Sequence, residues 1–223
     1  MARRARFTID EIRTQALEIV DHEGLDALTM RRLATALGTG PMTIYNYVDD
    51  RQGLEALVVD AVAALVEVPE PTGAWTDDVR AVARAMWEQV RRHPGAIPLI
   101  LTRRTSTASS LDAAEALLDA LRRGGFDGPL LLAAFRTVLG IVMGMAQAEL
   151  AGPLAASAPN GGRGEAERIE LLAGEDRPNL AALARIGSTS RPEDDFDAGL
   201  EFVLRGLRAF APGPGDTRPL DRS

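Results

Sequence analysis

The residues with the most informative chemistry lie together between Leu28 and Val48. This segment holds both tyrosines of the chain, Tyr45 and Tyr47, together with Asn46 and a pair of arginines. An asparagine amide can pair with the edge of adenine, and tyrosine and arginine side chains bind phosphate oxygens. No Asp or Glu occurs in this segment, although the whole chain has a net charge of −7. The combination predicts a surface that contacts double-stranded DNA.

The rest of the composition argues against an enzyme. The chain has no Cys, and all 25 of its basic residues are Arg, which excludes a thiolate nucleophile, a Schiff-base lysine and the lysine of a phosphate-binding loop. Its two histidines, His22 and His93, are far apart in sequence, and the acidic pairs at 77–78 and 194–195 are typical of helix starts. We therefore expect no catalytic site, no cofactor and no metal. The alternative function is a helical small-molecule-binding protein or scaffold without sequence-specific DNA binding.

Composition and patterning indicate a soluble, all-α protein. Of the 223 residues, 46% are hydrophobic and 26% are charged, and apolar residues recur with helical spacing almost throughout. The first ten residues lack the apolar run of a signal peptide, which predicts a cytoplasmic location. The longest apolar segment, Leu130–Ala146, is short for a membrane span and carries Arg136. A helix buried on two sides explains that segment better, so no membrane partner is expected.

Capping signals divide the N-terminal part into four helices. Suitable N-cap residues mark their starts, at Thr8, Thr29, Gly40 and Asp50. Glu11 completes a capping box at the first start, and Pro41 suits the first position of the third helix. Gly24 and Gly38 end the first two helices. The fourth helix, Arg51–Val66, has regular amphipathic spacing.

Beyond a break at Val68–Trp75 the pattern indicates a larger helical bundle. Its expected helices are Asp77–Arg92, Ala96–Arg103, Thr107–Arg123, Pro129–Leu150, Asn179–Ile186 and Pro192–Phe210. The Gly/Pro-rich segment Ala151–Gly164 is predicted to be a loop. We therefore expect a helix-turn-helix DNA-binding domain over residues 1–66, a ligand-binding and dimerisation domain over 67–210, and a disordered tail over 211–223.

The third helix separates into two faces at about 100° per residue. Ile44 and Val48 point inward, Met42 and Asn46 point outward, and Tyr47 lies at the boundary. An arginine-rich arm at residues 1–6 can add a phosphate or minor-groove contact. The N-terminal domain as a whole is not basic, since it contains 7 Arg and 10 acidic residues. The acid-free window therefore carries the prediction, because a carboxylate on this face would repel phosphates.

These residues resemble the N-terminal domain of the tetracycline-repressor (TetR) family of bacterial regulators. The pattern that carries the resemblance is Gly24, Ala27-Leu28-Thr29, Arg32-Leu33-Ala34, Leu37-Gly38, Thr43-Ile44-Tyr45-Asn46-Tyr47-Val48 and Leu54. Residues 194–210 also resemble the closing helix of the branch nearest the tetracycline repressor. The resemblance implies an all-α fold with an N-terminal helix-turn-helix and a C-terminal ligand-binding and dimerisation bundle.

Together with the outward face of the third helix, the resemblance implies a set of DNA contacts. They are Thr29, Arg31, Arg32, Thr39, Gly40, Pro41, Met42, Thr43, Tyr45, Asn46, Tyr47 and Arg51. Thr39 stands where the family more commonly has an aliphatic residue, and Gly40 stands where a Ser or Thr cap is commoner. These two departures predict a recognition helix that is held less rigidly.

A homodimer is expected, because paired helix-turn-helix units read the two half-sites of a palindrome. The interface is predicted to combine Pro129–Leu150 with the final helix. The apolar face of the final helix consists of Phe196, Leu200, Val203, Leu204 and Leu207. Gly199 and Gly206 would permit close approach of the helices. The same residues can instead form the core of one subunit.

A small-molecule effector is expected to bind in the larger domain, in an apolar pocket with a few polar anchors. The candidates are Met86, Trp87, His93, Phe126, Phe135, Met143 and Gln147. Because the histidines are only His22 and His93, a metal–drug complex of the kind that the tetracycline repressor binds is not expected. A ligand that moves the fourth helix would change the separation of the two recognition helices and release a repressor from its operator.

Overall fold

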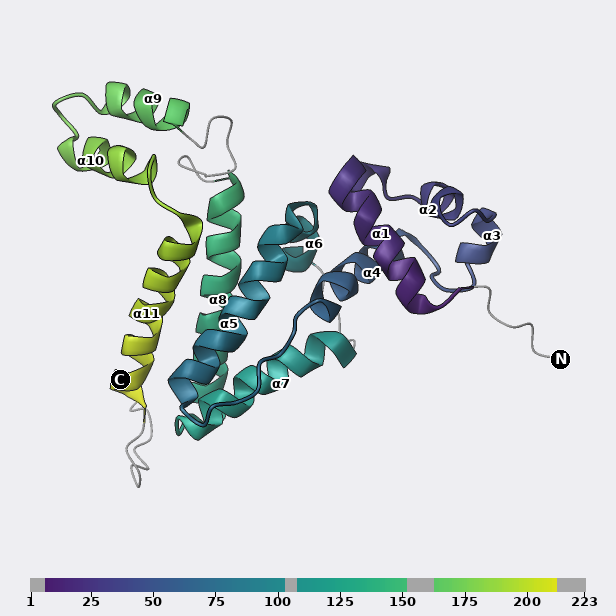
Figure 1. Cartoon of the computed structure of the whole chain (residues 1–223), viewed down its shortest axis with the longest axis horizontal. Helices are drawn as coiled ribbons and strands as arrows, with labels where there is room; N and C mark the ends of the chain where they lie inside the picture. The colour runs from purple at the N-terminus through teal and green to yellow at the C-terminus, as the bar shows by residue number, and fades with distance from the viewer. Residues whose placement is uncertain (1–6, 103–107, 152–162, 212–223) are drawn as a thin grey trace. The chain divides into compact units, whose positions relative to one another are not determined.

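The computed structural model describes residues 7–102, 108–151 and 163–211, and every regular element in those ranges is a helix. The chain forms two compact units. The first unit comprises Met1–Val68 and Glu88–Ala116, and the second comprises Pro69–Trp87 and Leu117–Ser223. The all-α prediction is confirmed (Figure 1). The expected disordered tail beyond Ala211 lies outside the described residues, as does the arginine-rich arm at residues 1–6.

The first unit contains the predicted helix-turn-helix and a short helix from later in the chain. Its complete helices are α1 (Ile9–Glu23), α2 (Met30–Ala36), α3 (Pro41–Ile44), α4 (Arg51–Ala64) and α6 (Ile97–Thr102), with short 3₁₀ turns at Leu25–Ala27 and Pro94–Ala96. It also contains the helical residues 88–92 and 108–116, which belong to two longer helices. The predicted caps are confirmed. Thr8 and Glu11 form a complete capping box, Thr29 accepts a hydrogen bond from the Arg32 amide, and Asp50 accepts one from the Gly53 amide.

One hydrophobic core holds these helices together. Apolar residues at helical spacing on α1, α2, α3 and α4 all turn into it, and its fully buried members include Ile12, Ile19, Leu33, Ile44, Leu54 and Val58. Ala96 and Leu99 join the same core from the α6 region. Gly95 lies so close to α1 that a Cβ there would stand 2.9 Å from the Val20 side chain. The segment that leads into α6 is therefore packed tightly onto α1.

The second unit is a longer helical assembly. It contains part of α5 (Trp75–Arg92) and of α7 (Ala108–Arg123), with α8 (Gly128–Ala151), α9 (Arg163–Ala173), α10 (Pro178–Gly187) and α11 (Pro192–Phe210). All the predicted helices are present, and the bounds differ by a few residues. Helix α9 was not predicted, because its polar first turns follow a Gly/Pro-rich stretch. The predicted loop Ala151–Gly164 lies largely outside the described residues, and α9 already includes its last two positions.

Aromatic side chains form the centre of the second unit. Trp87 on α5 stacks on Phe196 of α11, with ring centroids 4.4 Å apart and an interplanar angle of 9°. Phe126 meets Trp75 edge-on at 5.7 Å. Helix α8 turns the buried stripe Leu131, Ala134, Val138, Val142 and Ala146 inward and packs against α11. By length and composition α8 would suffice to cross a membrane, and 28% of that apolar window is buried. The predicted burial on two sides is not found within one subunit, because a single stripe of α8 is buried and Leu132 is exposed.

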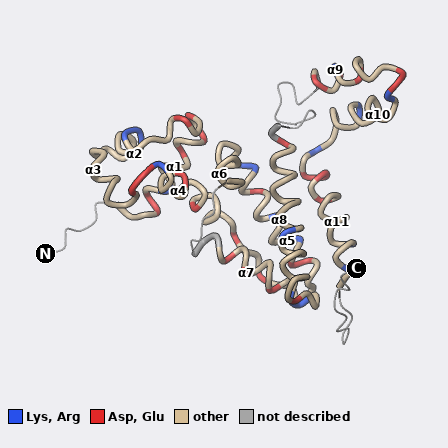
Figure 2. Tube along the Cα trace, turned by 180° about the vertical axis from the view of Figure 1, so that it is seen from behind, with Lys and Arg blue, Asp and Glu red and all other residues tan. Residues whose placement is uncertain are grey.

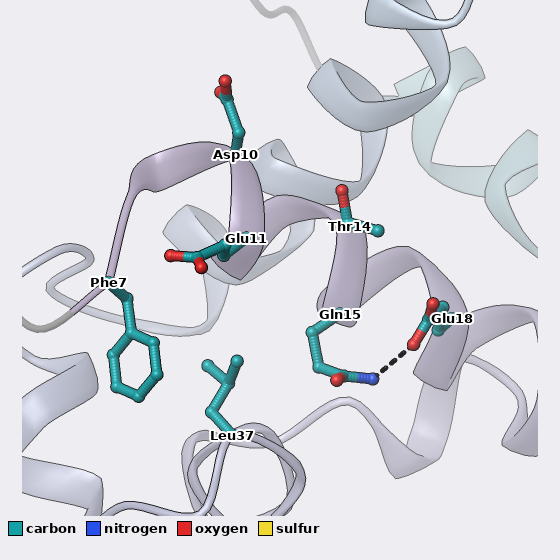
Figure 3. Close-up of a pocket in the computed structure, with 7 residues that line it drawn as sticks. All are labelled: Phe7, Asp10, Glu11, Thr14, Gln15, Glu18 and Leu37. Atoms are coloured by element: carbon teal, nitrogen blue, oxygen red, sulfur yellow. Dashed lines mark hydrogen bonds between the residues drawn. The ribbon is translucent and has the colours of Figure 1, made fainter.

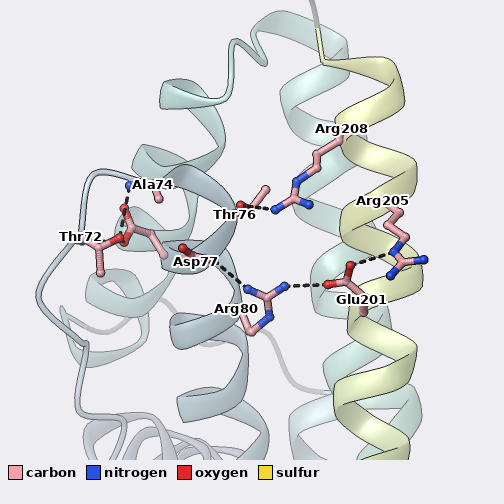
Figure 4. A network of polar contacts seen from close by, with 9 residues as sticks. Thr72, Ala74, Thr76, Asp77, Arg80, Glu201, Arg205 and Arg208 are labelled. Atoms are coloured by element: carbon pink, nitrogen blue, oxygen red, sulfur yellow. Dashed lines mark hydrogen bonds and ion pairs between the residues drawn. The ribbon is translucent and has the colours of Figure 1, made fainter.

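Polar contacts fasten the start of α5 to α11 (Figure 4). Arg80 donates hydrogen bonds to Asp77 at 2.9 Å and to Glu201 at 2.7 Å, and Glu201 also accepts from Arg205 at 2.8 Å. Arg208 donates to the hydroxyl of Thr76 at 2.8 Å. Hydrogen bonds from its two arginines hold the pKa of Glu201 below its usual range. These contacts fix the register of α11 against α5.

Candidate DNA-binding surface

A tight turn joins α2 to α3. The backbone enters the left-handed region at Gly38, where φ is 61°, and the Thr39 amide donates to the Ala34 carbonyl at 2.8 Å. Helix α3 starts with Gly40 as its N-cap and Pro41 as its first residue, as predicted. Its α-helical part ends at Ile44, and turn hydrogen bonds continue the coil to Val48. The recognition helix is therefore shorter than its sequence pattern suggested.

The two faces of this short helix are those that the spacing predicted. Ile44 is fully buried and Val48 is nearly so, whereas Met42 is 76% exposed and Tyr45 is 47% exposed. Asn46 is also exposed, and Thr43 is half-buried. Figure 2 shows arginine but no acidic residue along α2 and α3. An uncharged polar face that projects from a rigid core can enter the major groove without repelling the phosphates.

The three predicted arginines differ in what surrounds them. Arg32 makes a two-point ion pair with Glu23 of α1, and its hydrogen bond holds the pKa of that carboxyl below the usual range. Arg51 donates to Glu55 at 3.0 Å, one turn along α4. Arg31 is exposed, and no carboxylate pairs with it in the part of the chain that the structure describes. Arg31 is therefore the guanidinium best placed to bind a phosphate or a base.

The hydroxyl of Tyr47 is engaged inside the unit. It donates to the Phe7 carbonyl at 2.9 Å and accepts from the Phe7 amide at 3.1 Å. Thr29 likewise uses its hydroxyl as the cap of α2. The sequence predicted this capping role of Thr29, but it did not predict that the Tyr47 hydroxyl would bond to the backbone of Phe7.

An open depression of about 440 Å³ lies between α1 and the end of α2 (Figure 3). Its lining residues are Phe7, Asp10, Glu11, Thr14, Gln15, Glu18 and Leu37. Three of them are acidic, and Glu11 is already used in the capping box. Its acidic lining repels phosphates, so the depression itself is not suited to DNA.

The seven effector candidates do not form a single group. Trp87 and Phe126 are buried in the aromatic centre of the second unit. In the same unit Met86, Phe135 and Met143 are half-buried and Gln147 is exposed. His93 belongs to the first unit, where its Nδ1 lies 2.8 Å from a carboxylate oxygen of Asp21.

For three residues of the final helix the structure decides between the two predicted alternatives, a dimer interface and the core of one subunit. Phe196, Leu200 and Leu204 are fully buried within their own subunit, so they cannot contact a partner. A Cβ on Gly199 would stand 3.2 Å from Ile141 of α8, whereas one on Gly206 would meet nothing within 4 Å. The close approach predicted at Gly199 is therefore between helices of one subunit.

Two short helices joined by a tight turn, with the second exposing a polar and acid-free face, define a helix-turn-helix regulator. The model of the tetracycline repressor-like C-terminal domain matches residues 68–211. The chain is 32% identical to the HTH-type transcriptional repressor DrrR1 of Streptomyces coeruleorubidus, over 96% of this chain and 82% of that protein. The chain belongs to the TetR family.

Solved structures agree with this family assignment. Apo ActR of Streptomyces coelicolor is 30% identical, with a TM-score of 0.79 over 94% of this chain and 98% of that chain. ActR in complex with actinorhodin gives a TM-score of 0.78, also at 30% identity, over 94% of this chain and 100% of that one. The chain is thus a transcriptional regulator and not an enzyme.

Proposed function

We propose that this regulator is a repressor that binds a palindromic operator as a homodimer and is released by a small organic effector. The observation that carries the proposal is the acid-free, outward face of α3, with Met42, Tyr45 and Asn46 exposed beside Arg31. Such a face supplies an amide for adenine, apolar atoms for thymine methyl groups and groups that bind phosphate. Because its proposed partner is operator DNA, we propose that the protein is cytoplasmic.

Within this surface the side chains have different proposed roles. Asn46, Met42 and Thr43 face base edges, and Tyr45 and Arg31 bind phosphates or a flanking base. The backbone at Gly40 and Pro41, and the side chains of Thr39, Thr29 and Tyr47, hold the reading residues in place. Arg32 and Arg51 contribute positive charge from within their ion pairs. The arm at residues 1–6 remains a proposed additional contact.

The proposed dimer uses the outer faces of α8 and α11. On α11 the side opposite the buried residues is exposed. It carries Phe202, which is 73% exposed, and Phe210. On α8 the exposed side carries Leu132. Large apolar side chains on the surface of a regulator mark an interaction site, and a two-fold interface would bring the two recognition helices to successive half-sites.

The hairpin of α9 and α10 offers further apolar surface for the same dimer. Its buried residues are alanines, Ala166, Ala173, Ala181 and Ala184. Most of its large apolar residues are exposed instead: Leu171, Leu172, Leu180, Leu183 and Ile186. The Glu170–Arg185 ion pair links the two helices. Because the small residues are buried and the large apolar residues are exposed, we propose that the hairpin packs against a second subunit.

An effector site in the second unit is supported by the likeness to ActR, which has been solved with actinorhodin and with (S)-DNPA. The half-buried candidates Met86, Phe135 and Met143 are the ones that remain available to a ligand. Trp87 and Phe126 are buried in the same unit and are not exposed to a ligand. The proposed ligand is a small organic molecule with a large apolar surface.

Release from DNA is proposed to follow a shift in population. The contact between α6 and α4 lies inside the first unit, so a displacement of α6 would be felt by α4 and by the recognition helix next to it. A ligand must favour the non-binding state by about 5 kcal/mol to move the population from almost wholly bound to almost wholly released. A smaller preference would give partial release.

Selection of bound fragments from a random DNA pool tests the DNA-binding part of the proposal. A palindrome with half-sites about one helical turn apart is the expected result. Gel shifts on the selected sequence should then show a log affinity that falls steeply with log salt. Failure to enrich any sequence, with a weak salt dependence, would favour the helical small-molecule-binding protein instead. Release of the selected DNA by actinorhodin or (S)-DNPA, with which ActR has been solved, tests the effector part separately.

A further inference from the structure

A side-chain hydrogen bond crosses from the turn to the recognition helix. The hydroxyl of Thr39 donates to the hydroxyl oxygen of Thr43 at 2.9 Å. Both side chains are half-buried, so the bond is partly shielded from water. It joins a turn residue to one of the residues that face the DNA.

This bond stands where the start of α3 otherwise lacks a side-chain anchor. The N-cap is Gly40, which makes no side-chain cap hydrogen bond. Helix α3 has only four residues, so its own backbone bonds hold it weakly. Thr39 is itself fixed, since its amide donates to the Ala34 carbonyl at 2.8 Å. Thr39 and Gly40 depart from the residues that are commoner in the family, and these departures predicted a loosely held helix. The hydrogen bond from Thr39 to Thr43 compensates for the missing side-chain cap at Gly40.

The bond restricts the rotamer of Thr43. A helical threonine usually divides between two χ1 rotamers, because its hydroxyl can turn back toward the preceding turn or away from it. A hydroxyl held by Thr39 leaves the Thr43 methyl group in one fixed position. A methyl group contacts the C5-methyl of thymine, whereas a freely turning hydroxyl can bond to several bases. One fixed rotamer therefore reads a base pair more selectively than two.

We infer that Thr39 is a specificity-determining residue, which positions the Thr43 side chain without contacting a base itself. The inference rests on the proposed operator binding. Thr39 sharpens the preference at the one base pair in each half-site that faces Thr43. Affinity for the phosphate backbone is set elsewhere on the surface, by Arg31 and Tyr45.

The test compares base preferences of variants of the full-length protein, with each position of the selected half-site replaced in turn. Thr39→Val keeps the shape and removes the hydroxyl, and Thr39→Ser keeps the hydroxyl. Thr35→Val is the matched control, because the Thr35 hydroxyl donates to the Arg31 carbonyl on α2 and does not reach α3. Thermal melting establishes that each variant is folded.

Thr39→Val is expected to lower discrimination by about fivefold at a single base pair per half-site. Discrimination at the other positions and the salt dependence of binding should stay unchanged. Thr39→Ser should retain the wild-type preference, and Thr35→Val should have no effect on it. In a Thr43→Ala background, Thr39→Val should add nothing further, since the two side chains act as one unit.

Two results would overturn the inference. One is an unchanged preference in folded Thr39→Val, and the other is a loss spread evenly over all positions, which would make Thr39 a general stabiliser of the domain. Both presuppose that the wild-type protein selects a palindrome. If the wild-type protein selects no sequence, the proposed function fails instead, and the two failures are thereby distinguished.

Discussion

The hydroxyl of Tyr47 makes both of its hydrogen bonds with the backbone of Phe7, donating to the carbonyl at 2.9 Å and accepting from the amide at 3.1 Å. Phe7 immediately precedes the N-cap of α1, so this side chain ties the end of the recognition segment to the first helix. Tyr45 has the same chemistry two residues earlier, but it is exposed. The two tyrosines of the chain therefore have separable roles.

Tyr47→Phe should destabilise the DNA-binding helices. The change leaves the amide and carbonyl of Phe7 without their side-chain partner, which costs about 1 kcal/mol in the free energy of unfolding. Urea titration followed by circular dichroism measures this cost. Tyr45→Phe is the matched control, and we expect it to leave the unfolding free energy unchanged while weakening operator binding. Equal stability of the two variants would mean that the bond to Phe7 contributes nothing.

Arg31→Ala and Arg32→Ala should differ in their effect on the salt dependence of binding. Each phosphate contact contributes about one to the slope of log affinity against log salt. Arg31 has no carboxylate partner within the ranges that the structure describes. Its loss should therefore make the slope of log affinity against log salt less steep, by about one. Arg32 is held by Glu23, and its loss should lower the slope less. Fluorescence anisotropy at several salt concentrations measures both. A larger effect for Arg32 would show that its ion pair opens on DNA.

Local signals predicted the helix-turn-helix well. Caps at Thr8, Thr29 and Asp50 depend on neighbouring residues only, and the inward placement of Ile44 and Val48 follows from helical periodicity. The same reasoning could not show the partners of side chains. Arg32 meets a carboxylate nine residues earlier, and Tyr47 meets a backbone 40 residues away. Contacts of this kind depend on tertiary structure, which spacing does not encode.

Periodicity also left the apolar stripe of α11 ambiguous. It identified Phe196, Leu200 and Leu204 as one face, but an apolar face looks the same whether its own subunit or a partner covers it. The structure buries these three residues against the second unit's interior. Phe202, which the pattern placed outside the stripe, is the large aromatic residue left exposed. Helix α9 was missed because composition alone separates a polar helix poorly from a loop.

Phe202→Ser should weaken the proposed dimer without unfolding the subunit. Its side chain is 73% exposed, so the subunit loses little packing, whereas a dimer interface would lose a large apolar contact of about 1.5–3 kcal/mol per copy. Sedimentation velocity over a concentration series should show a shift toward monomer. Ile9→Ser is the matched control, because Ile9 is also an exposed apolar residue but lies on α1. An identical association constant in both variants would exclude this face of α11.

The carboxylate of Asp78 offers a test of the second unit by pH. Asp78 is buried, and Thr72 donates to one of its oxygens from both its amide and its hydroxyl, each at 2.7 Å. Arg123 donates to the other oxygen at 2.7 Å. The Thr72 amide above all, and then the Thr72 hydroxyl and Arg123, outweigh the opposing effect of burial and lower the pKa of Asp78 to about 2, from an ordinary value of 3.8.

Asp78→Asn should therefore destabilise the protein in a pH-dependent way. Because the pKa of Asp78 is lower in the folded state, its ionised form stabilises the fold above the ordinary pKa, and this contribution is lost as the pH falls from about 4 to about 2. The difference in unfolding free energy between wild type and variant should be on the order of 2 kcal/mol near pH 7. It should shrink as the pH falls through that window. Other carboxyls whose pKa is lowered, such as Glu201, titrate equally in wild type and variant, so the comparison cancels their contribution. A difference in unfolding free energy that stays constant from pH 7 to pH 2 would rule out this role for the ionised Asp78.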